Sequence, residues 1–180
     1  ITLLYGAGRT TGYPALLAPL AGAPHGVVAV GVIAVVTGLM FKAGGVPAHF
    51  WVPDVTEGTS APVAAFVTTV PKIGALVALF RLLAVAIPTA AVNWPMLVAV
   101  LAAASMTLGN LAAFFQTSVK RLLAYSTISQ VGYLLMAVAV ATTSSTALRA
   151  LLFYLAAYAA TNLAAFAVVV LGGLGSVAGA

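Results

Sequence analysis

An all-α bundle of membrane-spanning helices is the fold class that this sequence predicts. Of its 180 residues, 63% are hydrophobic and 5% are charged, whereas a typical soluble domain carries about 25% charged residues. The apolar stretches reach the length of roughly 20 residues at which a helix crosses a bilayer, and they lack the alternation typical of barrel strands. Because the chain begins at Ile1 and ends in apolar sequence at Ala180, we expect it to be part of a longer protein.

The first 25 residues are expected to be the end of one helix followed by a loop rich in glycine, proline and threonine. A first membrane segment then covers residues 26–44, and it is predicted to be a discontinuous helix near Lys42–Pro47. Gly44 and Gly45 permit unwinding, and Pro47 lacks the amide donor that a continuing helix needs. Inside lipid, such a break is tolerated where protein or water satisfies the freed backbone groups.

Four further segments are expected to follow, each separated from the next by a short polar or proline-containing connection. Thr59 or Ser60 is a suitable cap for the second segment, and Trp94 before the third fits an anchor at the membrane interface. The final residues are expected to form a loop or to begin another segment. The predicted ranges are 60–87, 95–115, 119–141 and 147–171 for the segments and 172–180 for the end.

Lys42 and Lys72 are expected to lie at mid-membrane depth on consecutive segments. An ionisable side chain is costly there unless it meets a partner or water, so it is a candidate functional residue. Burial disfavours the charged form of an amine, which suits a group that takes up and releases a proton. The alternative interpretation is that one or both lysines extend along the helix to reach the headgroups.

Polar side chains also form stripes on two of the apolar segments. The spacing on segment 119–141 predicts that they share one helix face, and segment 147–171 carries a second set. Either set can be hydrogen-bonding contacts between helices, which are ordinary in membrane bundles, or a hydrated path for protons between the lysines. The residues are Tyr125, Ser126, Ser129, Gln130 and Tyr133 in the first set, and Tyr154, Tyr158, Thr161 and Asn162 in the second.

The connection after the break holds both acidic residues of the sequence, Asp54 and Glu57. They can form a solvated surface, a proton entrance or a pair with a cation. If every segment crosses once, this connection lies on the same side of the membrane as Lys120 and Arg121. His49 is either a hydrogen-bonded packing residue or a proton relay, since its ordinary pKa is close to neutral.

Several classes of function are excluded or disfavoured by composition. The net charge of +5 comes from seven basic residues scattered singly or as one pair among apolar segments, which does not indicate nucleic acid binding. The absence of cysteine excludes cysteine-held iron–sulfur clusters, and two distant histidines do not suggest a haem or zinc site. We find no sequence motif for bond-making catalysis, so any redox chemistry is expected to belong to a partner.

The residues around the lysines resemble the antiporter-like subunits of proton-pumping NADH:quinone oxidoreductase, or respiratory complex I. The similarity covers nearly the whole chain. Its motifs are Phe41-Lys42, Val46-Pro47, His49, Trp51, Pro53-Asp54-Val55, Gly58, Pro62-Val63, Lys72 with Arg81, Gly109-Asn110, Gln116, Val119-Lys120-Arg121-Leu122-Leu123-Ala124-Tyr125-Ser126 and Gln130-Val131-Gly132-Tyr133.

The pattern from Tyr154 to Phe166, together with the absence of a histidine and a lysine there, is similar to the N-type subunit. Two positions depart from the family pattern, since Ala48 replaces a bulkier apolar residue and Pro71 replaces a small polar one.

The resemblance implies a proton channel in which Lys42 pairs with a glutamate on an earlier helix and Lys72 passes protons to a lysine on a later one. The path residues it implies are Lys42, His49, Lys72, Tyr125, Ser129, Tyr133, Tyr158 and Asn162, with no catalytic or metal-binding residue in the chain. It further implies a multi-pass location in a bacterial plasma membrane, within a complex whose other subunits carry NADH, FMN, iron–sulfur clusters and quinone. The alternatives are a subunit of a multi-subunit sodium/proton antiporter and a passive scaffold.

Overall fold

Helices account for all the regular structure of this chain in the computed structural model, which describes residues 1–90 and 92–178 and side-chain surroundings through residue 172. No strand occurs in these ranges, so the predicted all-α fold class is confirmed. The helices are α1 (Thr2–Gly8), α2 (Tyr13–Gly22), α3 (His25–Ala43), α4 (Trp51–Gly58), α5 (Ala61–Arg81), the π-helix η1 (Leu82–Ala86), α6 (Trp94–Ala113), α7 (Val119–Ala139) and α8 (Ala147–Ala178).

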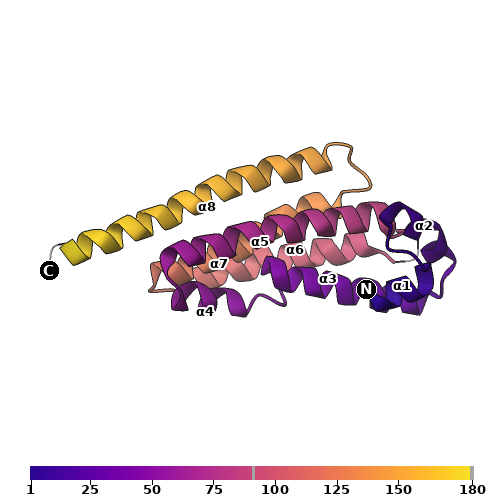
Figure 1. Cartoon of the computed structure of the whole chain (residues 1–180), viewed down its shortest axis with the longest axis horizontal. Helices are drawn as coiled ribbons and strands as arrows, with labels where there is room; N and C mark the ends of the chain where they lie inside the picture. The colour runs from indigo at the N-terminus through magenta and orange to yellow at the C-terminus, as the bar shows by residue number, and fades with distance from the viewer. Residues whose placement is uncertain (91, 179–180) are drawn as a thin grey trace.

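Five of these helical stretches are long and apolar enough to cross a membrane: His25–Ala43, Ala61–Ala86, Trp94–Ala113, Val119–Ala139 and Ala147–Gly172. In Figure 1, α3, α5, α6 and α7 run along one another, with α1 and α2 at one end and α4 at the other. Helix α8 crosses the bundle obliquely, and its C-terminal end extends beyond α4 and α7.

The two ends of the chain differ from the sequence-based expectation. The expected loop within residues 1–25 contains α2, in which Pro14 occupies the first turn, where the missing amide donor costs nothing. At the other end, α8 continues through Gly172, Gly173 and Gly175 to Ala178, so residues 172–178 extend the last segment, whereas a loop or the start of another segment was expected there. Residues 179–180 lie outside the described part. Glycine weakens a helix by about 1 kcal/mol relative to alanine but does not by itself end one.

The break after Lys42 occurs where the glycines predict it. Helix α3 ends at Ala43, and Gly44 follows with a φ of 74°, in the left-handed conformation that glycine adopts readily. The amide groups of Gly44 and Gly45 both donate to the Met40 carbonyl, at 2.8 and 3.0 Å. Helix α4 then begins at Trp51, and the Trp51 indole donates a 2.8 Å hydrogen bond back to the Phe41 carbonyl.

Helices α6 and α7 approach each other closely through glycine. A Cβ atom added to Gly109 on α6 would lie 2.7 Å from the Ser129 amide nitrogen on α7. A Cβ atom added to Gly132 on α7 would lie 2.8 Å from the Ala102 carbonyl oxygen on α6. Small residues at such contacts let two helix backbones approach in a membrane, where dispersion contacts rather than the hydrophobic effect favour association.

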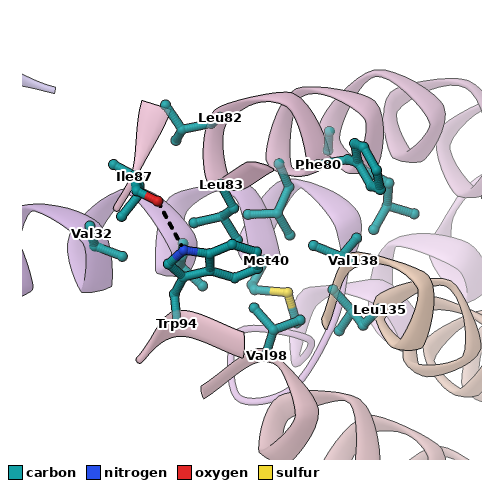
Figure 2. Close-up of a cluster of buried hydrophobic side chains, with 14 of the residues drawn as sticks. Val32, Met40, Phe80, Leu82, Leu83, Ile87, Trp94, Val98, Leu135 and Val138 are labelled. Carbon is teal, nitrogen blue, oxygen red and sulfur yellow. Dashed lines mark hydrogen bonds between the residues drawn. The ribbon is translucent and has the colours of Figure 1, made fainter. Parts of the chain in front are cut away.

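Trp94 lies in the hydrophobic core rather than on the outer surface of the bundle. Its side chain is fully buried among residues of η1, α6 and α7, as Figure 2 shows. Its indole nitrogen donates a 3.2 Å hydrogen bond to the Ile87 carbonyl, directly after η1. The expectation of an interfacial anchor was therefore wrong, because the backbone satisfies the polar atom that would otherwise draw an indole toward headgroups.

Candidate buried proton site

Lys72 is the central residue of the candidate site. It lies in α5, one residue after Pro71, and its side chain is completely buried. The amine donates a hydrogen bond to the Thr127 carbonyl of α7, at 3.3 Å. Helix α5 continues through Pro71 without interruption, so this departure from the family pattern leaves Lys72 pointing into the bundle. No path to the headgroups along the helix is available to a side chain buried in this way.

The amine of Lys72 has no side-chain carboxylate partner among the described residues. Both acidic residues of the sequence lie in α4 and pair with Arg121. The polar contact of Lys72 in the described residues is with the main chain, at the Thr127 carbonyl, and the backbone at the end of α3 lies nearby. Gly44 is so close that a Cβ atom added to it would lie 3.7 Å from the Lys72 Nζ atom.

Lys42 lies in the last turn of α3, and its side chain is exposed on the surface of this chain. The structure brings the backbone two residues after Lys42 next to Lys72, but it shows no contact between the two amines within the described residues. A cation in the last turn of a helix is favoured by the carbonyl end of the helix dipole.

Two residues of α8 form hydrogen bonds to α5 directly before Lys72. The Tyr158 hydroxyl donates to the Thr68 carbonyl at 2.6 Å, and the Asn162 amide donates to the Thr68 and Thr69 hydroxyls at 2.9 and 2.8 Å. All four side chains are buried. Sequence reasoning singled out Tyr158 and Asn162 but missed Thr68 and Thr69. These threonines lie four and three residues before Lys72, on its face of the helix.

The polar stripe of α7 lies between two neighbouring helices, α6 and α8, so its residues have partners on both. Ser129 is buried against Gly109 of α6. Toward α8, Gln130 accepts a hydrogen bond from Tyr154, and the Tyr133 ring lies 6.3 Å from the Tyr154 ring. Consecutive residues on a helix point about 100° apart, which is enough to place Ser129 and Gln130 against different partners.

Tyr125 is half-buried near the start of α7, where it packs on a small apolar cluster that includes Val52 and Ile128. His49 is half-buried in the connection between α3 and α4. The His49 Nδ1 atom and the Ser129 Oγ atom are buried, and neither has a hydrogen-bond partner among the described residues. In the same connection, the Val46 amide donates to the Ser105 hydroxyl of α6 at 3.0 Å, a partner that the sequence did not suggest.

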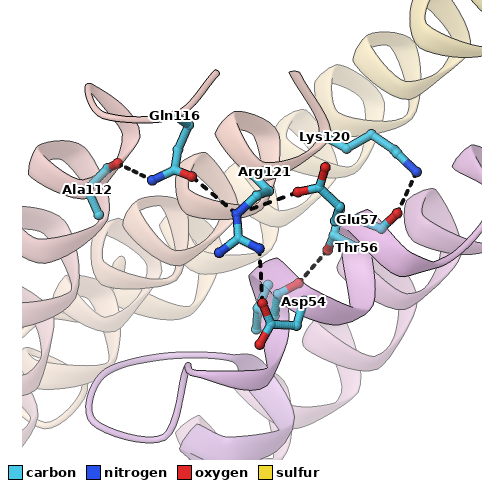
Figure 3. Close-up of polar contacts among 8 residues, drawn as sticks. Asp54, Thr56, Glu57, Ala112, Gln116, Lys120 and Arg121 are labelled. Carbon is cyan, nitrogen blue, oxygen red and sulfur yellow. Dashed lines mark hydrogen bonds and ion pairs between the residues drawn. The ribbon is translucent and has the colours of Figure 1, made fainter. Parts of the chain in front are cut away.

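The charged residues after the break form an interhelical cluster, shown in Figure 3. Arg121 of α7 contacts Asp54 at 3.0 Å and Glu57 at 3.5 Å, which places them at the same end of the bundle, as the predicted common side requires. The Lys120 amine donates to the Glu57 and Thr59 carbonyls at 2.7 and 3.0 Å. Of the three roles considered for the acidic pair, the structure favours pairing with a cation.

Comparison with known proteins identifies the family. The family model described as "NADH:quinone oxidoreductase/Mrp antiporter, TM" matches residues 1–174. This chain belongs to that family. Within the NADH:quinone oxidoreductase/Mrp antiporter family, a similar relative is NADH-quinone oxidoreductase subunit N 1 of Streptomyces griseus, which is 63% identical over 169 residues. That match covers 94% of this chain and 36% of the relative.

A second relative, NADH-quinone oxidoreductase subunit N of Mycobacterium sp. strain JLS, is 60% identical over 168 residues, covering 93% of this chain and 35% of the relative. The chain thus spans about a third of the length of the curated relatives it matches. These relatives confirm the resemblance to the N-type subunit.

Solved structures of family members have the same helical arrangement. A chain of the Mrp complex from Dietzia sp. DQ12-45-1b superposes with a TM-score of 0.80 at 28% identity, covering 92% of this chain and 30% of that one. A chain of respiratory complex I from Thermus thermophilus with bound aureothin superposes with a TM-score of 0.70 at 37% identity, covering 93% and 35%.

Proposed function

We propose that this chain is part of a proton-translocating membrane subunit of a bacterial NADH:quinone oxidoreductase. The observation that carries the proposal is the complete burial of Lys72 in a membrane helix, with a main-chain carbonyl as hydrogen-bond partner. A buried ionisable residue is expensive in a membrane and is a functional candidate for that reason. The identity of 63% and 60% to relatives named as subunit N supports this activity over others in the family.

The proposed mechanism is electrostatic. A change of charge near Lys42 alters the proton affinity of Lys72, which then accepts or releases a proton. Two unit charges about 8 Å apart interact by roughly 2 kcal/mol at an effective dielectric constant near 20. A proton moved against 100 mV costs about 2.3 kcal/mol. The two energies are of similar size, so coupling between neighbouring charges is strong enough to help drive transport.

The proposed path includes His49, Tyr125, Ser129, Tyr133, Tyr158 and Asn162 besides the two lysines. The His49 Nδ1 and Ser129 Oγ atoms support the inclusion of these two residues. Both atoms are buried and have no hydrogen-bond partner among the described residues, so each is available to bind a water molecule or a proton donor. The hydrogen bonds of Tyr158 and Asn162 to α5 support a role in holding Lys72 in place. In the complete complex, NADH, FMN, iron–sulfur clusters and quinone would be carried by partner subunits, and the complex would lie in the plasma membrane.

Replacement of Lys72 in the complete complex tests the proposal. Lys72→Met keeps most of the side-chain length but removes the charge, and Lys72→Ala removes both. We expect each variant to assemble and to pump fewer protons per electron than the unmodified complex. Arg81→Ala is a matched control, because Arg81 is an exposed cation at the end of the same helix. An unchanged ratio of protons to electrons in both Lys72 variants would contradict the proposal.

A subunit of a multi-subunit sodium/proton antiporter is the second candidate function, favoured by the TM-score of 0.80 to the Mrp complex chain. Purification of the native complex separates the two candidates. Flavin and iron–sulfur subunits accompany the chain if it belongs to an oxidoreductase, and an antiporter contains neither. A passive scaffold would instead tolerate Lys42→Met and Lys72→Met together without loss of transport.

A further inference from the structure

Gly44 has an unusual position at the end of α3. Its backbone adopts a φ of 74°, it is buried, and the bond that would carry a side chain points at two other elements. A Cβ atom there would lie 2.6 Å from the Val52 Cγ2 atom of α4, 3.7 Å from the Lys72 Nζ atom and 3.8 Å from the Lys72 Cε atom. The side of Gly44 without a side chain therefore faces the buried amine.

The end of α3 also has the polarity that an ammonium group requires. The last carbonyl groups of a helix carry partial negative charge, equivalent to about half an elementary charge at the helix end. Lys72 has one hydrogen bond to a protein group in the described part of the chain, to the Thr127 carbonyl, and an ammonium group has three hydrogens to donate. Both carboxylates are paired to Arg121, so the partial negative charge near the amine comes from main-chain carbonyls, and the end of α3 is close enough to contribute.

We propose that Gly44 is a positioning residue for Lys72. Its lack of a side chain lets the Lys72 amine lie against the carbonyl end of α3, and this contact couples the amine to the helix that carries Lys42. The inference rests on the proposed function for its role in transport, but the contact itself is a separate claim. Glycine is needed here for two reasons, the left-handed backbone and the proximity of the amine.

A comparison of aspartate with asparagine at position 44 tests the contact. The two side chains have nearly the same size, and both tolerate a left-handed backbone better than most residues. Val52→Ala is included in every variant, because it removes the Cγ2 atom that a new Cβ atom would meet first. In the complete complex we expect Gly44→Asp to pump at least about tenfold more slowly than Gly44→Asn. A carboxylate roughly 4 Å from the Lys72 amine stabilises the protonated amine, which then releases its proton less readily.

A second measurement uses assembly instead of transport. With Lys72 present, the carboxylate of Gly44→Asp has a partner; with Lys72→Met it is buried without one, which is strongly destabilising. We expect Gly44→Asp with Lys72→Met to leave at least about tenfold less assembled complex than Gly44→Asp alone. Gly44→Asn should assemble equally with either residue at position 72. Gly58→Asp and Gly58→Asn are the control pair, because Gly58 is exposed at the end of α4 and nothing lies within 4 Å of its added Cβ atom.

Three results would overturn the inference. The first is equal pumping by Gly44→Asp and Gly44→Asn in complexes in which Lys72→Met abolishes pumping, which would leave the proposed function standing. The second is assembly of the Gly44→Asp variant that does not depend on Lys72. The third is failure of Gly44→Asn with Val52→Ala to assemble whether residue 72 is lysine or methionine, since proximity of the amine would then not be what limits a side chain here. Normal pumping by Lys72→Met would reject the proposed function, and the assembly measurement would still decide whether Gly44 faces Lys72.

Discussion

The Tyr158 hydroxyl of α8 donates a 2.6 Å hydrogen bond to the main-chain carbonyl of Thr68, one turn before Lys72 in α5. A tyrosine thus connects α8 to the backbone that carries the buried lysine. Tyr158 is itself buried, and interhelical hydrogen bonds in membrane proteins contribute about 0.6 kcal/mol on average. The hydrogen bond therefore contributes modestly to stability, while it fixes how α8 lies against the lysine helix.

Removal of this hydroxyl should weaken the contact between α5 and α8 without creating a large cavity. We expect Tyr158→Phe to lower the free energy of unfolding of the solubilised subunit by about 1 kcal/mol. Thermal unfolding monitored by helical circular dichroism measures the change. Tyr5→Phe is the matched control, because Tyr5 is half-exposed in α1. A loss equal to that of Tyr5→Phe would show that the hydrogen bond does not stabilise the fold.

Asn162 should be more important than Tyr158 for the same contact, because its amide donates to two hydroxyl groups. Asn162→Leu removes both bonds and leaves the Thr68 and Thr69 hydroxyls without this partner. We expect a loss of about 1–2 kcal/mol. Because Tyr158 and Asn162 both contact Thr68, the double variant should lose less than the sum of the single losses. Strict additivity in the same unfolding measurement would mean that the two residues act independently.

The close approach of α6 and α7 predicts a strong effect at Gly109. Gly109→Ala would place a Cβ atom 2.7 Å from the Ser129 amide nitrogen, which is main chain and cannot rotate away. Overpacking of this kind costs about 1–3 kcal/mol, so we expect a lower unfolding temperature and less assembled complex. Gly74→Ala in α5 is the control, since nothing lies within 4 Å of its added Cβ atom. Equal stability of the two variants would contradict the packing described for α6 and α7.

Lys120 should hold the end of α4 in place. Its amine donates to the Glu57 and Thr59 carbonyls, which lie at the C-terminal end of an eight-residue helix. Helices of this length have little stability of their own. We therefore expect Lys120→Met to increase amide hydrogen exchange within Trp51–Gly58, as measured by mass spectrometry. Arg149→Met, at an exposed cation of α8, should leave exchange in α4 unchanged, and equal exchange in the two variants would reject this role for Lys120.

The arrangement around the break was predictable because strong local signals coincide there. Gly44, Gly45 and Pro47 each disfavour a continuous helix, and a lysine directly before them is conspicuous in apolar sequence. Trp94 was misinterpreted because burial of an indole depends on a carbonyl supplied by another segment, here that of Ile87. Sequence composition cannot indicate that partner.

Thr68 and Thr69 escaped notice for a related reason. A threonine in an apolar helix can satisfy its hydroxyl with a carbonyl of its own preceding turn, as the Thr68 hydroxyl does with Ala64 at 2.7 Å. The sequence therefore does not indicate that such a hydroxyl also has a hydrogen-bond partner on another helix. The division of the α7 stripe between α6 and α8 was likewise invisible, because it depends on which helices become neighbours in the bundle.

Several backbone groups in and beside the connection between α3 and α4 already form hydrogen bonds. The Val46 amide is bound to Ser105, the Gly45 amide to Met40, and the Trp51 indole joins the two sides through Phe41. Rewinding this stretch into a continuous helix would exchange existing hydrogen bonds for new ones with little net gain in free energy. The connection between α3 and α4 is therefore expected to keep its backbone conformation. A proton that passes this point during transport would move without any refolding of the main chain.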